Sequence, residues 1–185
     1  AAYAGSINPK ERTLSPSTAS PSLKNLSRIH RELGGLFHRH QEALLSGDLA
    51  RARALFQDYE AALRSHTREE DEVLIPLYRE RALPPPRGGS PEYFTGEHQK
   101  INEWLGRLRL RLSRLTGGAK GSRALLALLD DEAFFKRYLE HHSLREDRVF
   151  YPVLDRLLTP RERTGLARLL SFTLEDQDLS EADPS

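Results

Sequence analysis

Two similar stretches of this chain each carry a histidine and a glutamate four residues apart. The first, SHTREEDEVLIPLY, starts at Ser65, and the second, HSLREDRVFYPVL, starts at His142. The stretches align at an offset of 76 residues, which pairs His66 with His142 and Glu70 with Glu146. Residues four apart lie on the same face of an α-helix. Each stretch therefore predicts two side chains with metal-ligand chemistry that point to the same side of a helix.

Apolar residues recur with a helical period in four long segments that are separated by capping and turn residues. We predict helices from Ser22 to about Ser46, from Asp48 to about Leu83, from Ser90 to about Leu115, and from Ser122 through Val153. A capping box at 159–162 predicts a short fifth helix over about 160–171. Pro76 and Pro152 are expected to kink or end their helices. The predicted fold class is all-α, an antiparallel up-down four-helix bundle with a short fifth helix.

The predicted domain organisation has three parts. Residues 1–21 contain several prolines among Ser and Thr and are expected to form a disordered N-terminal arm. Residues 22–158 are expected to form the bundle. Residues 159–185 are expected to hold the short helix and an acidic, frayed tail from Glu175 to Ser185.

Composition narrows the classes of function. The absence of cysteine excludes disulfides, thiolate ligands and thiol catalysis. A formal net charge of +1 gives no basis for a nucleic-acid partner. No apolar run approaches the roughly 20 residues that span a bilayer, so we expect no membrane association and a cytoplasmic location.

Two lone histidines complete the candidate site. His30 and His98 lie 68 residues apart, and each precedes one of the two histidine–glutamate pairs. The six residues all fall on the apolar faces of their predicted helices: His30, His66, Glu70, His98, His142 and Glu146. Imidazole and carboxylate together suit iron, manganese or zinc. Six ligands fit two ions better than one, with two histidines on each ion, both glutamates bridging, and an oxo or hydroxo bridge leaving a position for a small molecule.

Two alternatives compete with this interpretation. A single histidine on an apolar face is usually a hydrogen-bonded core residue, but six such residues in two-fold repetition are hard to explain as packing, because a buried carboxylate is costly unless it is paired or bound to a metal. A ferritin-like di-iron site is disfavoured, because it uses Glu-x-x-His with two lone glutamates. This chain has the inverse arrangement, which is richer in nitrogen.

The motifs resemble those of the hemerythrin-like family, also called the HHE cation-binding domain. The resemblance covers about residues 22–158. It rests on His30, on His66-x-x-x-Glu70 followed by LIP, on Glu97-His98, and on His142-x-x-x-Glu146 followed by FYP. The resemblance implies a four-helix bundle around two non-haem iron ions. It also implies a protein that binds oxygen, senses oxygen or iron, or responds to nitrosative or oxidative stress.

The ligand set departs from that of the oxygen-carrying hemerythrins. Those proteins place a second histidine four residues after the first on the third helix and an aspartate on the fourth. This chain has Asn102 and Glu146 at those positions. Four histidines and two glutamates are more similar to the di-iron proteins that repair iron–sulfur clusters after nitric oxide damage. Those usually carry an additional N-terminal domain with cysteine; this sequence contains no cysteine, and we expect no such domain.

The leading functional hypothesis is a di-iron centre that binds or reacts with O₂, NO or peroxide under oxidative or nitrosative stress, with iron supply for iron–sulfur cluster repair as one use. The alternative is a non-catalytic oxygen or iron sensor or carrier that acts through a protein partner. Steady consumption of NO or peroxide favours an enzyme, and a reversible spectral change without product favours a carrier or sensor.

Other residues carry weaker signals. Tyr59 lies seven residues before His66 on the same face and has Phe135 at its repeat position; it is the candidate for a hydrogen bond to an iron ligand or for iron ligation, and a core tyrosine is the alternative. The histidines His38, His40 and His141 are expected on solvated faces. The arginines at 107–114 are expected on a solvated face, with a docking patch as the alternative. Glu69 and Asp147 are expected as surface charges, with orientation of a ligand histidine as the alternative. The small-molecule pocket is expected to be dry and lined by Leu63, Leu105, Phe135, Leu139 and Trp104 or its neighbours.

Overall fold

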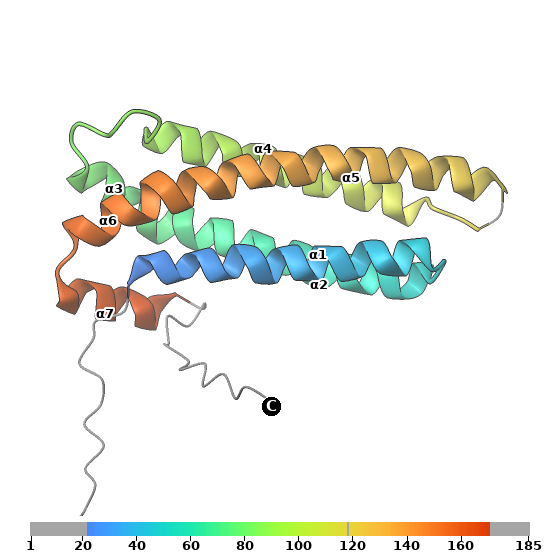
Figure 1. Cartoon of the computed structure of the whole chain (residues 1–185), viewed down its shortest axis with the longest axis horizontal. Helices are drawn as coiled ribbons and strands as arrows, with labels where there is room; N and C mark the ends of the chain where they lie inside the picture. The colour runs from blue at the N-terminus through green and yellow to red at the C-terminus, as the bar shows by residue number, and fades with distance from the viewer. Residues whose placement is uncertain (1–21, 118, 171–185) are drawn as a thin grey trace, which may run out of the picture.

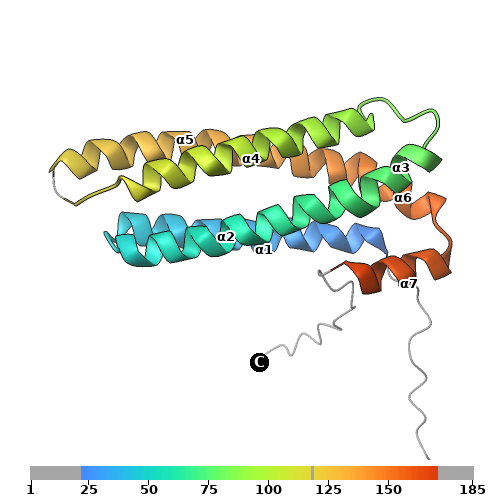
Figure 2. The same ribbon diagram turned by 180° about the vertical axis from the view of Figure 1, so that it is seen from behind.

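The computed structural model describes residues 22–117 and 119–170 of the chain. After a 3₁₀ turn at Leu23–Leu26, its long helices are α1 (Ser27–Leu45), α2 (Leu49–Glu69), α4 (Pro91–Ser113) and α5 (Ala119–Arg145). Contacts join α1 to α2, α2 to α4, α4 to α5 and α5 to α1, and successive helices run in opposite directions (Figures 1 and 2). The predicted antiparallel bundle is confirmed. The predicted arm at 1–21 and the tail from Glu175 to Ser185 lie outside the described residues.

The helix boundaries follow from local capping chemistry. Asp48 caps α2 by accepting a hydrogen bond from the Arg51 backbone N–H at 3.0 Å. The short helix α7 (Pro160–Leu169) begins with the predicted capping box between Thr159 and Glu162. The predicted start of the fourth helix at Ser122, with Ser122 as its cap, is wrong. α5 already begins at Ala119, so Ser122 lies within its first turn.

Both helices that carry a histidine–glutamate pair contain one π-helical turn. The segment Glu70–Leu74 joins α2 to α3 (Ile75–Arg81), and its closing bond runs from the Ile75 N–H to the Glu70 carbonyl. This bond spans five residues instead of the four of an α-helix. π turns inside α-helices occur frequently at functional sites. The first candidate glutamate therefore lies where the helix widens.

The second half repeats this arrangement. The segment Glu146–Phe150 joins α5 to α6 (Tyr151–Leu157), and the Tyr151 N–H bonds to the Glu146 carbonyl. Pro76 and Pro152 each lie two residues after the end of their π turn. Proline lacks an N–H and crowds the preceding turn. The wider turn accommodates that misfit, so both prolines are followed by further helix and neither ends its helix.

One histidine that was predicted to be exposed is buried. His40 is fully buried: its Nδ1 lies 2.8 Å from the Ala52 carbonyl oxygen, and its Nε2 lies 2.9 Å from Oε1 of buried Glu132. The correction follows from packing, because α1 contacts both α2 and α5 and so buries a wider stripe than the periodic seam alone. His38 and His141 are exposed as predicted.

Within residues 22–117 and 119–170, no helix combines the length and the hydrophobicity needed to cross a membrane.

Candidate metal centre

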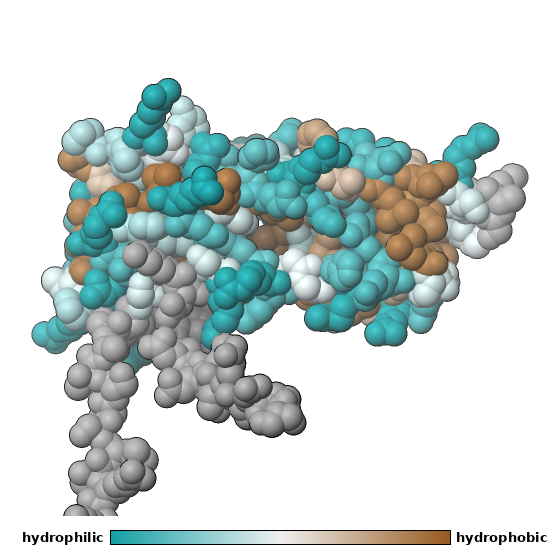
Figure 3. All heavy atoms as spheres, viewed as in Figure 1, coloured by the Kyte–Doolittle hydropathy of each residue, from teal (hydrophilic) through white to brown (hydrophobic). Residues whose placement is uncertain are grey.

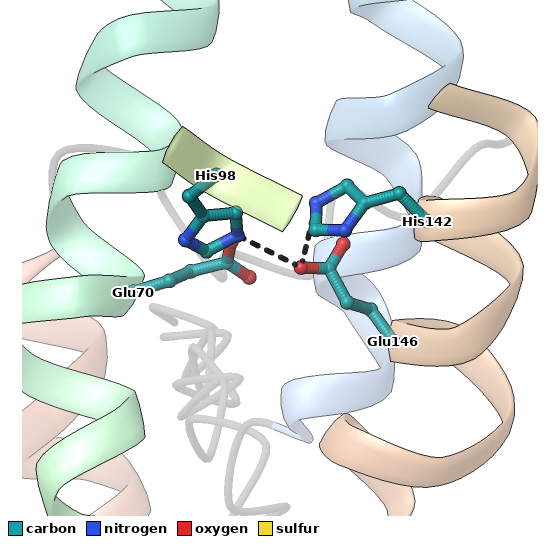
Figure 4. Close-up of side chains that lie close together, drawn as sticks. All are labelled: Glu70, His98, His142 and Glu146. Atoms are coloured by element: carbon teal, nitrogen blue, oxygen red, sulfur yellow. Dashed lines mark hydrogen bonds and ion pairs between the residues drawn. The ribbon is translucent and has the colours of Figure 1, made fainter. Parts of the chain in front are cut away.

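The structure brings all six predicted residues into one cluster inside the bundle. One group comprises Glu70, His98, His142 and Glu146, and a second comprises His30, His66 and Glu146. Within each group the ligand atoms lie within 4.8 Å of one another. Five of the six residues are buried, and His30 is partly exposed. Figure 4 shows the first group, whose side chains converge from different helices on a common space. We call these six residues the ligand cluster.

Glu146 stands between the two pairs of histidines. Its Oε1 lies 3.0 Å from His142 Nε2 and 3.4 Å from His98 Nε2. Its Oε2 lies 3.1 Å from His30 Nε2. The two oxygens of one carboxylate therefore face histidines from opposite halves of the chain, which is the arrangement that a bridging carboxylate requires.

Glu70, from the first half of the chain, lies close to one histidine of each half. Its Oε2 lies 3.6 Å from His66 Nε2, on its own helix, and 3.4 Å from His98 Nε2 on α4. Its other oxygen, Oε1, accepts a hydrogen bond of 2.5 Å from the buried Tyr151 hydroxyl. The sequence interpretation missed Tyr151. The available signal was the repeat itself, because Tyr151 occupies the position that Ile75 holds in the first half.

In three of the ligand histidines, the Nδ1 atom lies close to an acidic side chain. His98 Nδ1 donates to Asp71 Oδ1 at 2.8 Å, and His142 Nδ1 donates to Glu97 Oε2 at 3.0 Å. A carboxylate on Nδ1 fixes the ring and leaves Nε2 as the metal ligand. The sequence interpretation gave neither acid this role.

Asp147 was expected as a surface charge, with orientation of a ligand histidine as the alternative, and its contacts agree with the alternative. Its Oδ1 lies 3.3 Å from His30 Nδ1 and accepts a 2.7 Å hydrogen bond from the Ser27 hydroxyl. Asp71 and Asp147 are 76 residues apart and each directly follows a ligand glutamate. The repeat therefore contained the signal for both aspartates.

The carboxylates of the cluster raise the pKa values of two ligand histidines. Burial lowers the pKa of His98, but Asp71 and the two cluster glutamates outweigh it and raise that pKa to about 12. Burial also lowers the pKa of His30, yet Asp147 and Glu146 raise it to about 10. Without a metal, protons on the imidazoles balance the carboxylates.

The two remaining histidines of the cluster differ from each other. For His142, burial lowers the pKa, but Glu146 and Glu97 raise it to about 9. For His66, burial dominates over the attraction of Glu70 and lowers the pKa. Burial raises the pKa of Glu146, but the adjacent His142, His30 and His98 hold it well below its usual range. When no cation is present, the cluster thus combines an ionised Glu146 with imidazoles at His30, His98 and His142 that carry protons.

The buried polar atoms of the ligand cluster suit a cation. Among the described residues, Glu70 Oε2, Glu146 Oε2 and His142 Nε2 are buried and make no hydrogen bond of good geometry, although each lies 3.0–3.4 Å from an oppositely charged group of the cluster. Incomplete hydrogen bonding of buried polar atoms is costly, and all three atoms face the interior of the cluster. Nitrogen and carboxylate donors of this kind suit iron, manganese or zinc.

Tyr59 lies beside the ligand cluster, on the wall of the adjoining cavity. Its side chain is buried, packs against Phe37 with ring centroids 4.7 Å apart, and lines the same cavity as His30, His66 and His142. Burial, with a smaller contribution from Glu132, raises the pKa of Tyr59, so its phenol keeps its proton. Its predicted role toward an iron ligand stays a prediction.

The expected pocket lining is correct in part. Leu63 and Leu139 line the cavity that reaches the ligand cluster. Trp104 instead packs against Phe134 on the α4–α5 surface, with ring centroids 5.2 Å apart, and Arg107 lies over its ring. Leu105 and Phe135 belong to the buried core. The seam positions were assigned correctly, but their periodicity does not tell on which side of the bundle the cavity opens.

Comparison with known proteins agrees with this geometry. The Hemerythrin HHE cation binding domain family matches the chain over residues 21–133 and again over 90–181. The two matches begin nearly as far apart as His30 and His98, as an internal repeat requires. No curated protein and no solved structure gives a significant match. With this match over more than half of its length and with a buried histidine–glutamate cluster inside a helical bundle, the chain belongs to the hemerythrin HHE cation-binding domain family.

Proposed function

We propose that the ligand cluster holds two non-haem iron ions and that this centre binds or reacts with O₂, NO or peroxide in oxidative or nitrosative stress. The observation that carries the proposal is the position of Glu146, whose two oxygens face His142 and His98 on one side and His30 on the other. His98 and His142 would hold one ion, and His30 and His66 the other.

The iron, when bound, supplies the redox chemistry and the coordination position for the small molecule. The protein fixes where that position is. The carboxylates of Asp71 and Glu97 orient the rings of His98 and His142 from behind. The hydroxyl of Tyr151 keeps its proton, because burial and the nearby Glu146 and Glu70 raise its pKa. It therefore restrains Glu70 by donating a hydrogen bond.

Tyr59 is the residue we assign to the bound small molecule. Its phenol lies on the wall of the cavity that reaches three ligand histidines and holds its proton at neutral pH. A phenol in that position can donate a hydrogen bond to an oxygen or a nitrogen atom bound in the cavity. The apolar side chains of Phe37 and Leu63 line the same space.

The proposal is tested by loading the protein with Fe(II) under anaerobic conditions and adding NO, O₂ or hydrogen peroxide. We expect visible absorption bands to change with each addition. His30→Ala should abolish the change, because His30 is held by Asp147 and faces Glu146. His38→Ala is the matched control, since His38 is an exposed histidine of the same helix. Wild-type spectra in His30→Ala would refute the assignment.

The same experiment separates the reactive centre from the sensor or carrier. Steady consumption of NO or peroxide with repeated additions supports a reactive centre. A fully reversible spectral change with no product supports a sensor or carrier, which would hold the same ligands but deliver its response through a protein partner.

A further inference from the structure

A cavity of about 290 Å³ connects the ligand cluster with the surface between α1 and α5. Figure 3 shows the hollow on this face, between the two helices, with hydrophobic residues at its base. Its inner end is formed by the imidazoles of His30, His66 and His142. We call it the access cavity.

The walls of the access cavity are mainly apolar. Leu33, Phe37, Tyr59, Leu63 and Leu139 contribute to them. A water molecule occupies roughly 30 Å³ in the liquid, so the access cavity has the volume of about ten water molecules. A diatomic molecule or hydrogen peroxide would fill only a small part of it. The dimensions therefore suit an organic molecule better than the smallest ligands of the centre.

The charges around the access cavity are balanced. Two cationic side chains, Arg31 and Lys136, and two anionic ones, Glu140 and Asp147, line it. Such an arrangement favours neither an anionic nor a cationic ligand. The inner end of the cavity meets three of the proposed metal ligands, His30, His66 and His142, so a polar group of a ligand placed there would face the metal centre. These features favour a neutral molecule with an apolar body and a small oxygen group at one end.

Gly34 keeps one side of the access cavity free of a side chain. It lies within α1 and lines the cavity, and a Cβ atom built on it would meet nothing within 4 Å. Glycine inside a helix is destabilising relative to alanine. Neither a positive φ nor a close contact requires glycine at this position. The space that the missing side chain leaves is therefore the structural consequence of having glycine here.

We propose that the access cavity binds a neutral, apolar organic molecule of about ten non-hydrogen atoms, with a hydroxyl or hydroperoxide group directed at the ligand histidines, and that Gly34 keeps the cavity open to it. The inference rests on the proposed function, because the oxygen group is placed at the metal centre. It adds a ligand class, organic alcohols and hydroperoxides, to the diatomic molecules and hydrogen peroxide.

The test is calorimetric titration of the metal-loaded protein with 2-phenyl-2-propanol, a redox-inert alcohol with the size of a small arylalkyl hydroperoxide. We expect saturable binding at one site per chain. The alcohol tert-butanol has the same head group but lacks the phenyl ring, and should bind at least about tenfold more weakly because it buries much less apolar surface. No saturable binding, or equal binding of the two alcohols, would overturn the proposal.

Two neighbouring glycines provide a matched pair of variants. Gly34→Leu places a side chain in the access cavity and should weaken binding of 2-phenyl-2-propanol by about tenfold or more. Gly35→Leu adds the same side chain to the same helix at a residue that does not line the cavity, and should bind as the unmodified protein does. Both changes improve helix propensity, so neither should lower the melting temperature. Equal affinities in both variants would refute the role of Gly34.

A second variant and the metal content keep the result unambiguous. Leu139→Trp narrows the access cavity from α5 and should also weaken binding if Gly34→Leu does not fold. Two metals per chain without alcohol binding would overturn this inference and leave the proposed function standing. Alcohol binding that is lost in Gly34→Leu, in a protein that binds no metal, would support the cavity as an organic site and contradict the proposed function.

Discussion

The first half of the bundle, from α1 to α3, and the second half, from α4 to α6, carry the same ligands in the same order. Each gives a lone histidine, then a histidine and a glutamate on the next helix, and then an aspartate directly after the glutamate. The aspartates are exchanged between the halves: Asp71 holds His98, and Asp147 lies beside His30. Neither half completes its own site, so metal binding and the docking of the halves depend on each other.

The halves differ in the residues around the ligands. The second half has Tyr151, which bonds to Glu70, where the first has Ile75. The first half has Tyr59 on the access cavity where the second has Phe135 in the core. The repeat therefore retains the candidate metal ligands, whereas the two tyrosines and the access cavity differ between the halves. We therefore expect symmetric changes to affect metal binding and asymmetric changes to affect reactivity.

Removal of the metal should have the largest effect, because it removes what both halves share. An ion at roughly 1,000 times its Kd stabilises the native state by about 4 kcal/mol. For a chain of this size each kcal/mol shifts the melting temperature by about 2–4 °C, so chelation should lower it by about 10 °C. Scanning calorimetry should show one transition for both halves. An unchanged melting curve after verified metal removal would mean that the cluster does not hold the halves together.

Glu146→Gln and Glu70→Gln should each reduce metal occupancy or the magnetic coupling between the ions. A glutamine keeps the volume, but its NH₂ group is a donor and cannot ligate as the second carboxylate oxygen does. We expect the larger loss for Glu146→Gln, because Glu146 lies close to three ligand histidines and Glu70 to two. Metal analysis and Mössbauer spectroscopy measure both effects. Two strongly coupled ions in either variant would remove the bridging role of that residue.

Asp71→Asn and Asp147→Asn test the exchanged aspartates. Loss of a carboxylate behind a ligand histidine typically reduces metal affinity by about 10–100-fold. The loss should be greater for Asp71→Asn, since Asp71 accepts a 2.8 Å hydrogen bond whereas Asp147 lies 3.3 Å from its histidine. Competition with a chelator measures the affinity, and Glu42→Gln, which alters the exposed partner of His38, is the control. Unchanged affinity in both variants would show that the aspartates do not support the ligands.

The two tyrosines should give the smallest effects and the clearest asymmetry. Tyr151→Phe removes a hydrogen bond to a charged group, worth about 1.5–3 kcal/mol, and Tyr59→Phe removes at most a neutral one, worth about 1 kcal/mol. We expect Tyr151→Phe to lower the melting temperature of the loaded protein. Tyr59→Phe should retain full iron content and change the visible spectrum or the rate with peroxide or NO. Identical spectra and rates for Tyr59→Phe would make Tyr59 a core residue only.

The ligand cluster was predictable from the sequence because its residues are polar, repeat at fixed offsets and fall on apolar helix faces. The four helices were also predictable, because hydrophobic periodicity and capping residues are local features of the sequence. The roles of Glu97 and Tyr151 depend on which helices lie side by side, and that is a property of the packed bundle. Burial of His40 against Glu132 was also missed, because both residues lie off the seam. Their contact forms only when α1 packs against α5.

The number of metal ions per chain tests the central claim most directly, because one shared cluster with two pairs of histidines has a definite stoichiometry. Freshly purified protein is loaded with Fe(II) under anaerobic conditions, freed of excess metal, and analysed for iron against protein concentration. We predict two ions per chain, from the two overlapping ligand groups that share Glu146. One ion per chain, or none, would contradict the account.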